Sequence, residues 1–138
     1  GALAAGGDIS DVNALSKFGE YFGMTYQIRD DLEDILGADQ VSQDLRNGNV
    51  TLPFLYLYEH GDEHSRKLLA ENFGDRNISA SIAKEISRRM GQVGSLAYCE
   101  KWLDEYSRKS LTSLEGMKDS LFKKYLTQLS NNIARSEA

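Results

Sequence analysis

The sequence predicts an all-α fold built as a helical bundle. One proline in 138 residues is far below ordinary usage, and proline is the residue that most strongly interrupts helices. Apolar residues recur at helical spacing, whereas the period-2 alternation of half-buried strands is nearly absent. The composition, 41% hydrophobic and 27% charged, is typical of a globular domain. A chain of this length can bury a core without a disulfide or a metal.

The longest periodic stretch predicts a helix over residues 11–36 that ends at Gly37. Its apolar stripe comprises Leu15, Phe18, Phe22, Ile28, Leu32 and Ile35. Gly19 and Gly23 lie inside the same helix, where a glycine costs about 1 kcal/mol relative to alanine. Because the sequence keeps them there, we expect this helix to pack closely against a neighbour.

The rest of the chain continues the helical pattern. Residues 37–50 are polar and punctuated by glycine, which predicts a loop with at most one turn of helix. Further helices are predicted at residues 51–61, 63–73, 79–90, 95–114 and 118–135, with breaks at Gly74 and Gly91. Core stripes are expected in the first of these at Phe54, Leu55, Leu57 and Tyr58, and in the last at Leu121, Phe122, Tyr125, Leu129 and Ile133. Residues 1–138 contain no evident linker or repeat, so one helical domain is predicted.

Charge and composition exclude several function classes. The net charge is −5, which argues against nucleic acid or an anionic membrane surface as a partner. No apolar run approaches the ~18 residues of a membrane span, so no stable membrane insertion and a cytoplasmic location are expected. Cys99 is the single cysteine and cannot form an internal disulfide. We expect it to be a small buried apolar residue in a reducing compartment.

One helix carries a polar stripe that can support chemistry. Gln27, Asp30, Asp31 and Asp34 fall within a sector of about 100° on the predicted first helix. The three carboxylates repel one another and lie in the last two turns, where the helix dipole disfavours negative charge. A divalent cation reverses this cost, and Mg²⁺ is typically held by one or two carboxylates, waters and phosphate oxygens. Acidic residues near a helix end can also simply face water, and the residues alone leave both interpretations open.

The residues around this stripe resemble a known family. Residues 19–34, GEYFGMTYQIRDDLED, resemble the second aspartate-rich motif of the trans-isoprenyl (polyprenyl) diphosphate synthases. Residues 44–55, DLRNGNVTLPFL, are similar to the stretch that follows that motif, and the opening GALAAGG resembles the helix before it. The resemblance covers about the first 60 residues, and the remaining helices fit the weaker C-terminal pattern of the family.

The resemblance implies a partial isoprenoid synthase fold and a Mg²⁺-dependent prenyltransferase. In this family two aspartate-rich motifs on facing helices hold Mg²⁺ ions that bridge an allylic diphosphate. The diphosphate leaves with the bonding electrons, the double bond of isopentenyl diphosphate attacks the allylic cation, and loss of a proton completes the elongation. By resemblance, Asp30 and Asp31 are catalytic, Asp30, Asp31 and Asp34 are metal ligands, and Gln27 binds substrate.

The sequence departs from the family pattern in its basic residues. The family places one lysine in a Gly-Lys pair after the second motif and another just before the Thr-Leu-Pro run. The first has no counterpart here, and Asn49 occupies the second position. Arg46 is a candidate substitute that would bind substrate, with an ordinary solvated loop arginine as the alternative.

The first aspartate-rich motif is absent from these residues, which implies the C-terminal half of a synthase bundle. Such a chain is expected to be inactive alone. It is also expected to form a homodimer or to associate with the missing N-terminal half. The alternatives are a noncatalytic short subunit of a heteromeric prenyl diphosphate synthase and a terpene cyclase fragment. Terpene cyclases generally lack the segment similar to GNVTLP.

Overall fold

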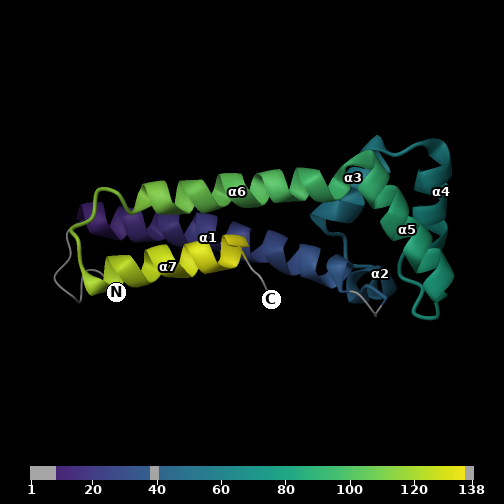
Figure 1. Ribbon diagram of the computed structural model, residues 1–138, viewed down its shortest axis with the longest axis horizontal. Coiled ribbons are helices and arrows are strands. Elements are labelled where there is room, and N and C mark those ends of the chain that lie inside the picture. Colours follow the sequence, from purple (N-terminus) through teal and green to yellow (C-terminus); the bar gives the residue numbers. More distant parts are fainter. Residues whose placement is uncertain (1–8, 38–40, 136–138) are drawn as a thin grey trace. The chain divides into compact units, whose positions relative to one another are not determined.

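The computed structural model describes residues 9–37 and 41–135. Every regular element among them is a helix, which confirms the predicted all-α class (Figure 1). The helices are α1 (Ile9–Leu36), α2 (Gln43–Asn47), α3 (Leu52–His60), α4 (Glu63–Asn72), α5 (Ala80–Val93), α6 (Ser95–Ser113) and α7 (Leu121–Arg135). The GALAAGG segment lies outside the described residues. The chain forms two compact units, residues 30–101 and residues 1–29 with 102–138.

The unit of residues 30–101 has a continuous apolar core. Helices α3, α4 and α5 pack against one another, and α2 adds Leu45 to the same cluster. The buried members of the cluster are Leu45, Phe54, Leu57, Leu69, Ile78, Ala83, Ile86 and Met90. On α3, Phe54 and Leu57 are buried as predicted, whereas Leu55 and Tyr58 are exposed. At 100° per residue Leu55 and Tyr58 lie to one side of the sector that Phe54 and Leu57 share, so the predicted stripe was too wide.

Side chains and glycines define the ends of these helices. The Asp62 carboxylate accepts the Ser65 N–H at the start of α4 at 2.7 Å, a typical N-cap. Helix α5 passes through Gly91 and ends at Val93, where Gly94, at φ 87°, caps it. The predicted break at Gly91 was therefore wrong, because the left-handed conformation that closes a helix is adopted three residues later.

Helix α2 is fixed at its C-terminal end by a contact between two glycine backbones. Gly48 and Gly74 both have positive φ, and a Cβ on Gly48 would lie 3.3 Å from the Gly74 Cα. The Gly74 N–H also donates to the Leu45 carbonyl at 2.8 Å. A Cβ on Gly48 would crowd the Gly74 backbone, whereas a Cβ on Gly74 would make an ordinary contact at 3.6 Å. The positive φ of both residues favours glycine at both positions.

The second unit, residues 9–29 and 102–135 in its described part, contains portions of α1 and α6 together with α7. Its buried hydrophobic cluster consists of Phe18, Leu114 and Leu126, with partly buried Leu15, Phe22 and Met117 against it. Ser110 and Ser130, both fully buried, hydrogen-bond to each other through their hydroxyls at 2.6 Å. These small side chains let α6 and α7 approach closely.

Arg29 connects α1 to the end of α7. Its guanidinium donates to the Ile133 carbonyl at 3.2 Å and to the Ala134 carbonyl at 2.7 Å. Those carbonyls belong to the last turn of α7, which has no further intrahelical donors. A cation at this position also favours the negative end of the helix dipole.

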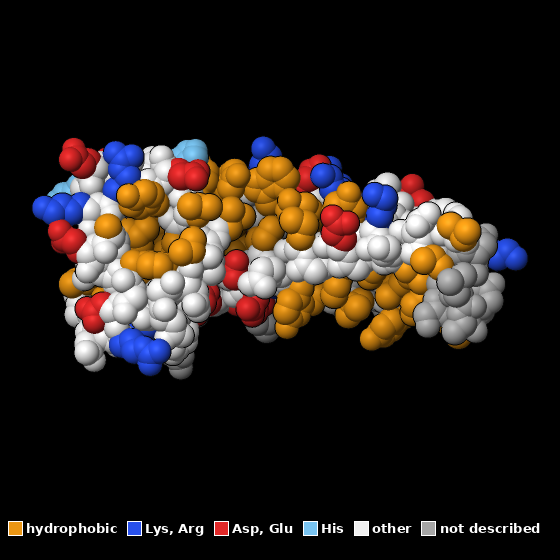
Figure 2. Space-filling view, turned by 180° about the vertical axis from the view of Figure 1, so that it is seen from behind, with side chains coloured by type: hydrophobic (Ala, Val, Ile, Leu, Met, Phe, Trp, Pro, Cys, Tyr) orange, Lys and Arg blue, Asp and Glu red, His pale blue; other side chains and the backbone are white. Residues whose placement is uncertain are grey.

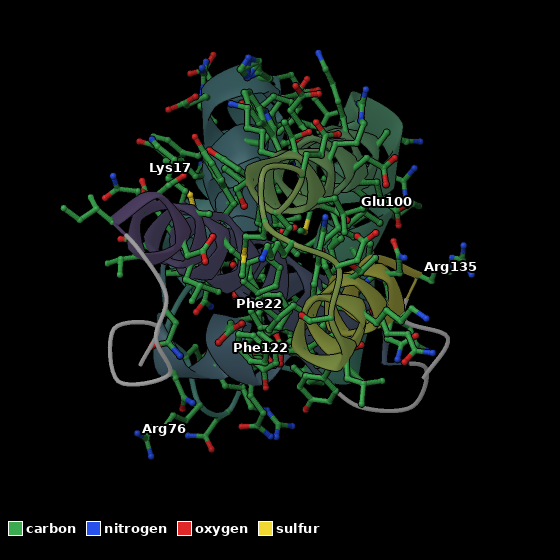
Figure 3. All side chains as sticks on the ribbon, turned by 90° about the vertical axis from the view of Figure 1, so that its left-hand side faces the viewer. Lys17, Phe22, Arg76, Glu100, Phe122 and Arg135 are labelled. Atoms are coloured by element: carbon green, nitrogen blue, oxygen red, sulfur yellow. The ribbon has the colours of Figure 1, made fainter. Side chains whose placement is uncertain are left out.

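One face of this unit is apolar and exposed, contrary to the predicted core stripe. Leu121, Phe122 and Tyr125 on α7 are 86%, 53% and 61% exposed, and Tyr26 on α1 is 54% exposed. The space-filling view shows hydrophobic side chains gathered along this edge (Figure 2). Phe22 and Phe122, from α1 and α7, extend toward the same side (Figure 3).

A Cβ added to Gly19 or Gly23 would meet nothing within 4 Å among the described residues, so the expected close approach at these glycines is not made within them. The expected start of the last helix was wrong. Helix α7 begins at Leu121 rather than near residue 118. The Ser120 hydroxyl accepts the Lys123 N–H at 3.1 Å, which fixes the start of the helix at this serine.

Candidate functional site

Asp34 lies near the end of α1 and binds the start of α2. Its carboxylate accepts hydrogen bonds from the Gln43 N–H at 2.9 Å, the Asp44 N–H at 3.3 Å and the Ser42 hydroxyl. The Ser42 oxygen in turn accepts the Leu45 N–H at 3.0 Å. The first N–H groups of α2 are therefore satisfied by two side chains, and Asp34 holds the DLRNGN segment beside the acidic end of α1.

Asp30, Asp34 and Asp44 bring negative charge together at this place. Asp30 is exposed and Asp44 is half-buried. The pKa of Asp44 is raised, first by burial and then by the charges of Asp34 and Asp30, while a hydrogen bond from Asn49 opposes the shift. The Asp44 N–H contact with Asp34 places this further carboxylate close enough to feel the charges of the α1 aspartates.

Asp31 points elsewhere. It is only 6% exposed, and its charge contributes, after burial, to raising the pKa of the Cys99 thiol on α6 to about 12. Cys99 is fully buried, which confirms its predicted role as a packing residue. Asp31 therefore faces the interior of the unit of residues 30–101, while Asp30 faces outward.

The two predicted substrate-binding residues, Gln27 and Arg46, have different surroundings in the structure. Gln27 is exposed on α1. Arg46, in the last turn of α2, is half-buried, and its Nε is buried without a hydrogen-bond partner in the described part of the chain. The Asn49 amide, at the family's lysine position, donates to the Asp44 carboxylate at 3.1 Å. Asn49 thus supports an acidic residue, whereas a lysine would add positive charge.

The donor set fits a divalent cation in part. Within residues 9–37 and 41–135 there is no group of three or more His, Cys, Asp or Glu side chains arranged around one metal position. Mg²⁺ nevertheless needs only one or two carboxylates when phosphate oxygens and waters complete its octahedron. Asp30 offers an exposed carboxylate, and the Asp34 carboxylate has about four acceptor positions in all, which leaves room beyond its three hydrogen bonds.

Sequence reasoning missed the residues that organise α2. Ser42 and Asp44 received no role, although Ser42 followed by a short polar segment is an N-cap signal. The interaction between Asp34 and the α2 backbone joins residues nine and ten positions apart. Helical periodicity cannot predict such a contact, because it depends on how the intervening segment returns the chain.

The protein is therefore all-α, and the aspartates near the end of α1 form a candidate site for a cation and a phosphate group. The chain belongs to the polyprenyl synthetase family, whose model matches residues 1–90. It is similar to the heptaprenyl diphosphate synthase component 2 of Geobacillus stearothermophilus, with 35% identity over 124 residues. The match covers 85% of this chain and 37% of that relative, so the chain spans well under half of the relative's length.

Solved structures show the same fold. A polyprenyl synthase from Caulobacter crescentus, complexed with calcium and isoprenyl diphosphate, superposes with a TM-score of 0.85 at 22% identity, over 99% of this chain and 43% of that one. A geranylgeranyl pyrophosphate synthase from Corynebacterium glutamicum, also complexed with calcium and isoprenyl diphosphate, gives a TM-score of 0.83 at 25% identity, over 98% of this chain and 43% of that one. None of the helices described here has the length and hydropathy needed to span a membrane.

Proposed function

We propose that the chain is the C-terminal part of a Mg²⁺-dependent prenyltransferase that condenses an allylic diphosphate with isopentenyl diphosphate. Its part is to supply the second aspartate-rich metal and diphosphate site. The observation that carries the proposal is the contact between Asp34 of α1 and the start of α2, which brings Asp44 into the electrostatic field of Asp34 and Asp30. The similar Corynebacterium glutamicum structure, with calcium and isoprenyl diphosphate bound, supports it.

Each aspartate has a distinct role in this proposal. Asp30 is the outward carboxylate that meets the cation directly. Asp34 contributes to the cation's field and holds α2 in place through its backbone hydrogen bonds. Asp31, which is buried, reaches the cation through water or after a change of side-chain rotamer. Bound Mg²⁺ would stabilise the charge on the departing diphosphate and orient it.

Two polar residues complete the proposed site. Gln27 offers an exposed amide on α1 to the substrate. Arg46 carries the positive charge that the missing lysines would otherwise supply, and its buried, unpartnered Nε indicates that the guanidinium has donor capacity to spare. Arginine binds phosphate oxygens well because its donors form a planar fork.

A complementary helical partner is part of the proposal. The exposed apolar face of Tyr26, Phe122 and Tyr125 is of the kind that monomeric soluble proteins rarely leave open. The similar relative is named as one component of a synthase, and structures of the same fold contain more than twice this length of chain. We infer that further helices, in the same polypeptide or in a separate subunit, cover this face.

Cation and diphosphate binding tests the site directly. We expect the chain to bind a bisphosphonate, a stable diphosphate analogue, only when Mg²⁺ is present, as measured by isothermal titration calorimetry. Asp30→Asn should weaken this binding at least tenfold, and Asp31→Asn should weaken it less. Glu71→Gln, on an exposed acid of α4, is the matched control. Equal binding by Asp30→Asn and the parent chain would show that the stripe is only a solvated surface.

Activity tests the proposed division of labour. The chain alone should not elongate an allylic diphosphate with isopentenyl diphosphate. A separately produced helical chain that carries the first aspartate-rich motif should restore elongation when the two are mixed. Elongation by the chain alone at the mixture's rate would contradict the proposal. Restored activity that is insensitive to Asp30→Asn would favour the noncatalytic subunit.

A further inference from the structure

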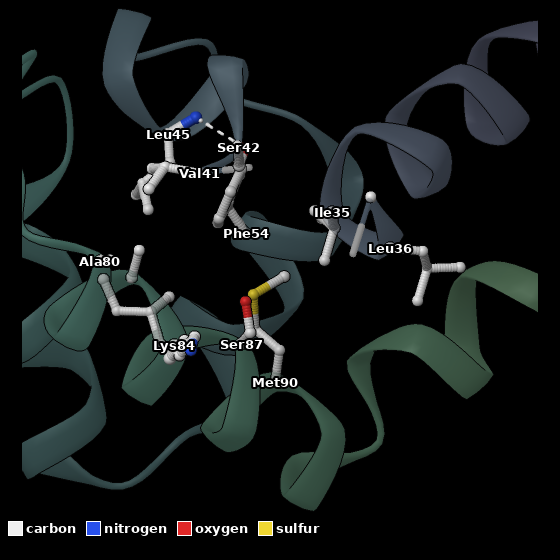
Figure 4. Close-up of a pocket in the computed structure, with 13 residues that line it drawn as sticks. Ile35, Leu36, Val41, Ser42, Leu45, Phe54, Ala80, Lys84, Ser87 and Met90 are labelled. Atoms are coloured by element: carbon white, nitrogen blue, oxygen red, sulfur yellow. Dashed lines mark hydrogen bonds between the residues drawn. The ribbon is translucent and has the colours of Figure 1, made fainter. Parts of the chain in front are cut away.

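A cavity of about 450 Å³ lies within the unit of residues 30–101; its lining does not include Asp30, and Ser42 is its lining residue that contacts Asp34. Ile35 and Leu36 come from the end of α1, Phe54 from α3, and Met90 from α5, with Val41 near the start of α2 (Figure 4). This volume is in the range of roughly 300–1,000 Å³ that small-molecule sites occupy. The proposed metal and diphosphate chemistry makes no use of it.

Small residues of α5 form the hollow. Ala80, Ala83, Lys84 and Ser87 all line the cavity, at the spacing that places residues on one helix face. Because two alanines and a serine occupy this face of α5, their side chains do not fill the space between α5 and the end of α1. At the rim, Leu36 is 52% exposed, so a hydrocarbon bound in the cavity would remove apolar surface from water.

The polar groups of the cavity lie on one edge. Lys84 and Ser87 are one helical turn apart and exposed, and neither makes an ion pair or a hydrogen bond with another described residue. Ser42, on the opposite side, already donates to Asp34 and accepts from Leu45. The free polar edge therefore consists of one ammonium and one hydroxyl, which together suit an anionic head group.

We propose that this cavity binds an anionic amphiphile, with its hydrocarbon against Ile35, Leu36 and Met90 and its charged head beside Lys84 and Ser87. The site is separate from the metal and diphosphate site, needs no cation, and stands or falls independently of the proposed prenyltransferase function. A carboxylate and a phosphate satisfy the same edge, so the two head groups are compared in the test.

Binding is measured by NMR on the 138-residue chain in EDTA, with decanoate, decyl phosphate and decanol as probes. Decanoate or decyl phosphate should shift the methyl signals of Ala83 and Met90, and the stronger of the two identifies the preferred head. Lys84→Gln should weaken anion binding about fivefold and leave decanol unchanged, whereas Lys67→Gln on α4 should change neither. Ala80→Met, at an exposed lining position, should weaken all three probes by partly filling the cavity.

Three outcomes would overturn the proposal. The first is the absence of shifts at Ala83 and Met90 with either anion at millimolar concentration. The second is equal affinity for decanol and the anions in both the parent chain and Lys84→Gln. The third is loss of binding in Asp30→Asn, which would place the anion at the metal site. Unchanged binding in Asp30→Asn, together with the Lys84→Gln effect, would support a separate site.

Discussion

The two units of the chain are built from the same kind of helix but finish their cores differently. In the unit of residues 30–101, α2, α3, α4 and α5 enclose a continuous cluster of buried hydrophobic residues. In the other unit the described buried cluster is Phe18, Leu114 and Leu126, while Phe122 and Tyr125 are exposed. Helix formation therefore does not require a closed core: α7 is fully helical although half of its apolar face is uncovered.

Truncation of a core side chain is expected to give the largest difference in lost stability between the two units. Leu57→Ala removes a side chain that is 1% exposed at the centre of the larger cluster, and should lower the free energy of unfolding by about 3 kcal/mol. Leu126→Ala, at 9% exposure in the smaller cluster, should cost about half as much. Urea unfolding followed by circular dichroism measures both. Equal losses would mean that the two cores are equally closed.

Substitution of Arg29 is expected to give the next largest loss of stability, confined to the unit that contains α7. Arg29→Gln removes the guanidinium that donates to the Ile133 and Ala134 carbonyls and should cost about 1–2 kcal/mol. Amide hydrogen exchange should become faster in the last turns of α7 and stay unchanged in α3–α5. Arg135→Gln, at an exposed position in the same turn, is the matched control. Similar exchange in both variants would show that Arg29 does not hold α7.

Removing the Asp34 cap of α2 is expected to give a smaller and local loss of stability in the unit of residues 30–101. Asp34→Ala should cost about 1 kcal/mol, because the Gln43 and Asp44 N–H groups lose their acceptor. Their amide exchange should become faster. Asp30→Ala, one turn earlier on α1 and exposed, should leave both amides unchanged. If both variants expose the two amides equally, α2 depends on the charge of the whole stripe and not on the Asp34 cap.

The smallest expected effect is a pH dependence on α5. Hydrogen bonds from Arg88 and Arg89 lower the pKa of Glu85 from its ordinary value of 4.5 to about 2. An acid whose pKa is lowered by folding adds stability above its unfolded pKa and loses that contribution as the pH falls through its folded pKa. Parent and Glu85→Gln chains should therefore differ slightly in urea midpoint at pH 7 and converge between pH 4.5 and 2. A difference that is constant with pH would exclude this ion pair as its cause.

The sequence was sufficient for elements whose signals are local. The C-terminal end of α1, the extent of α4 and the burial of Leu32 and Cys99 follow from periodicity and glycine stops, whereas α1 begins at Ile9, before the expected start at residue 11. Exposure of Phe122 could not be predicted, because a helical stripe shows that a face is apolar and does not show what covers it. At the candidate site, periodicity placed three aspartates in one sector. It could not show that Asp31 turns inward or that Asp34 caps α2, since both depend on packing between distant segments.

Helix α2 is held at both ends by groups outside the segment that precedes it: its first N–H groups by Asp34 and its last turn by Gly48 against Gly74. The position of α2 is therefore set by tertiary contacts and not by the five residues of the helix itself.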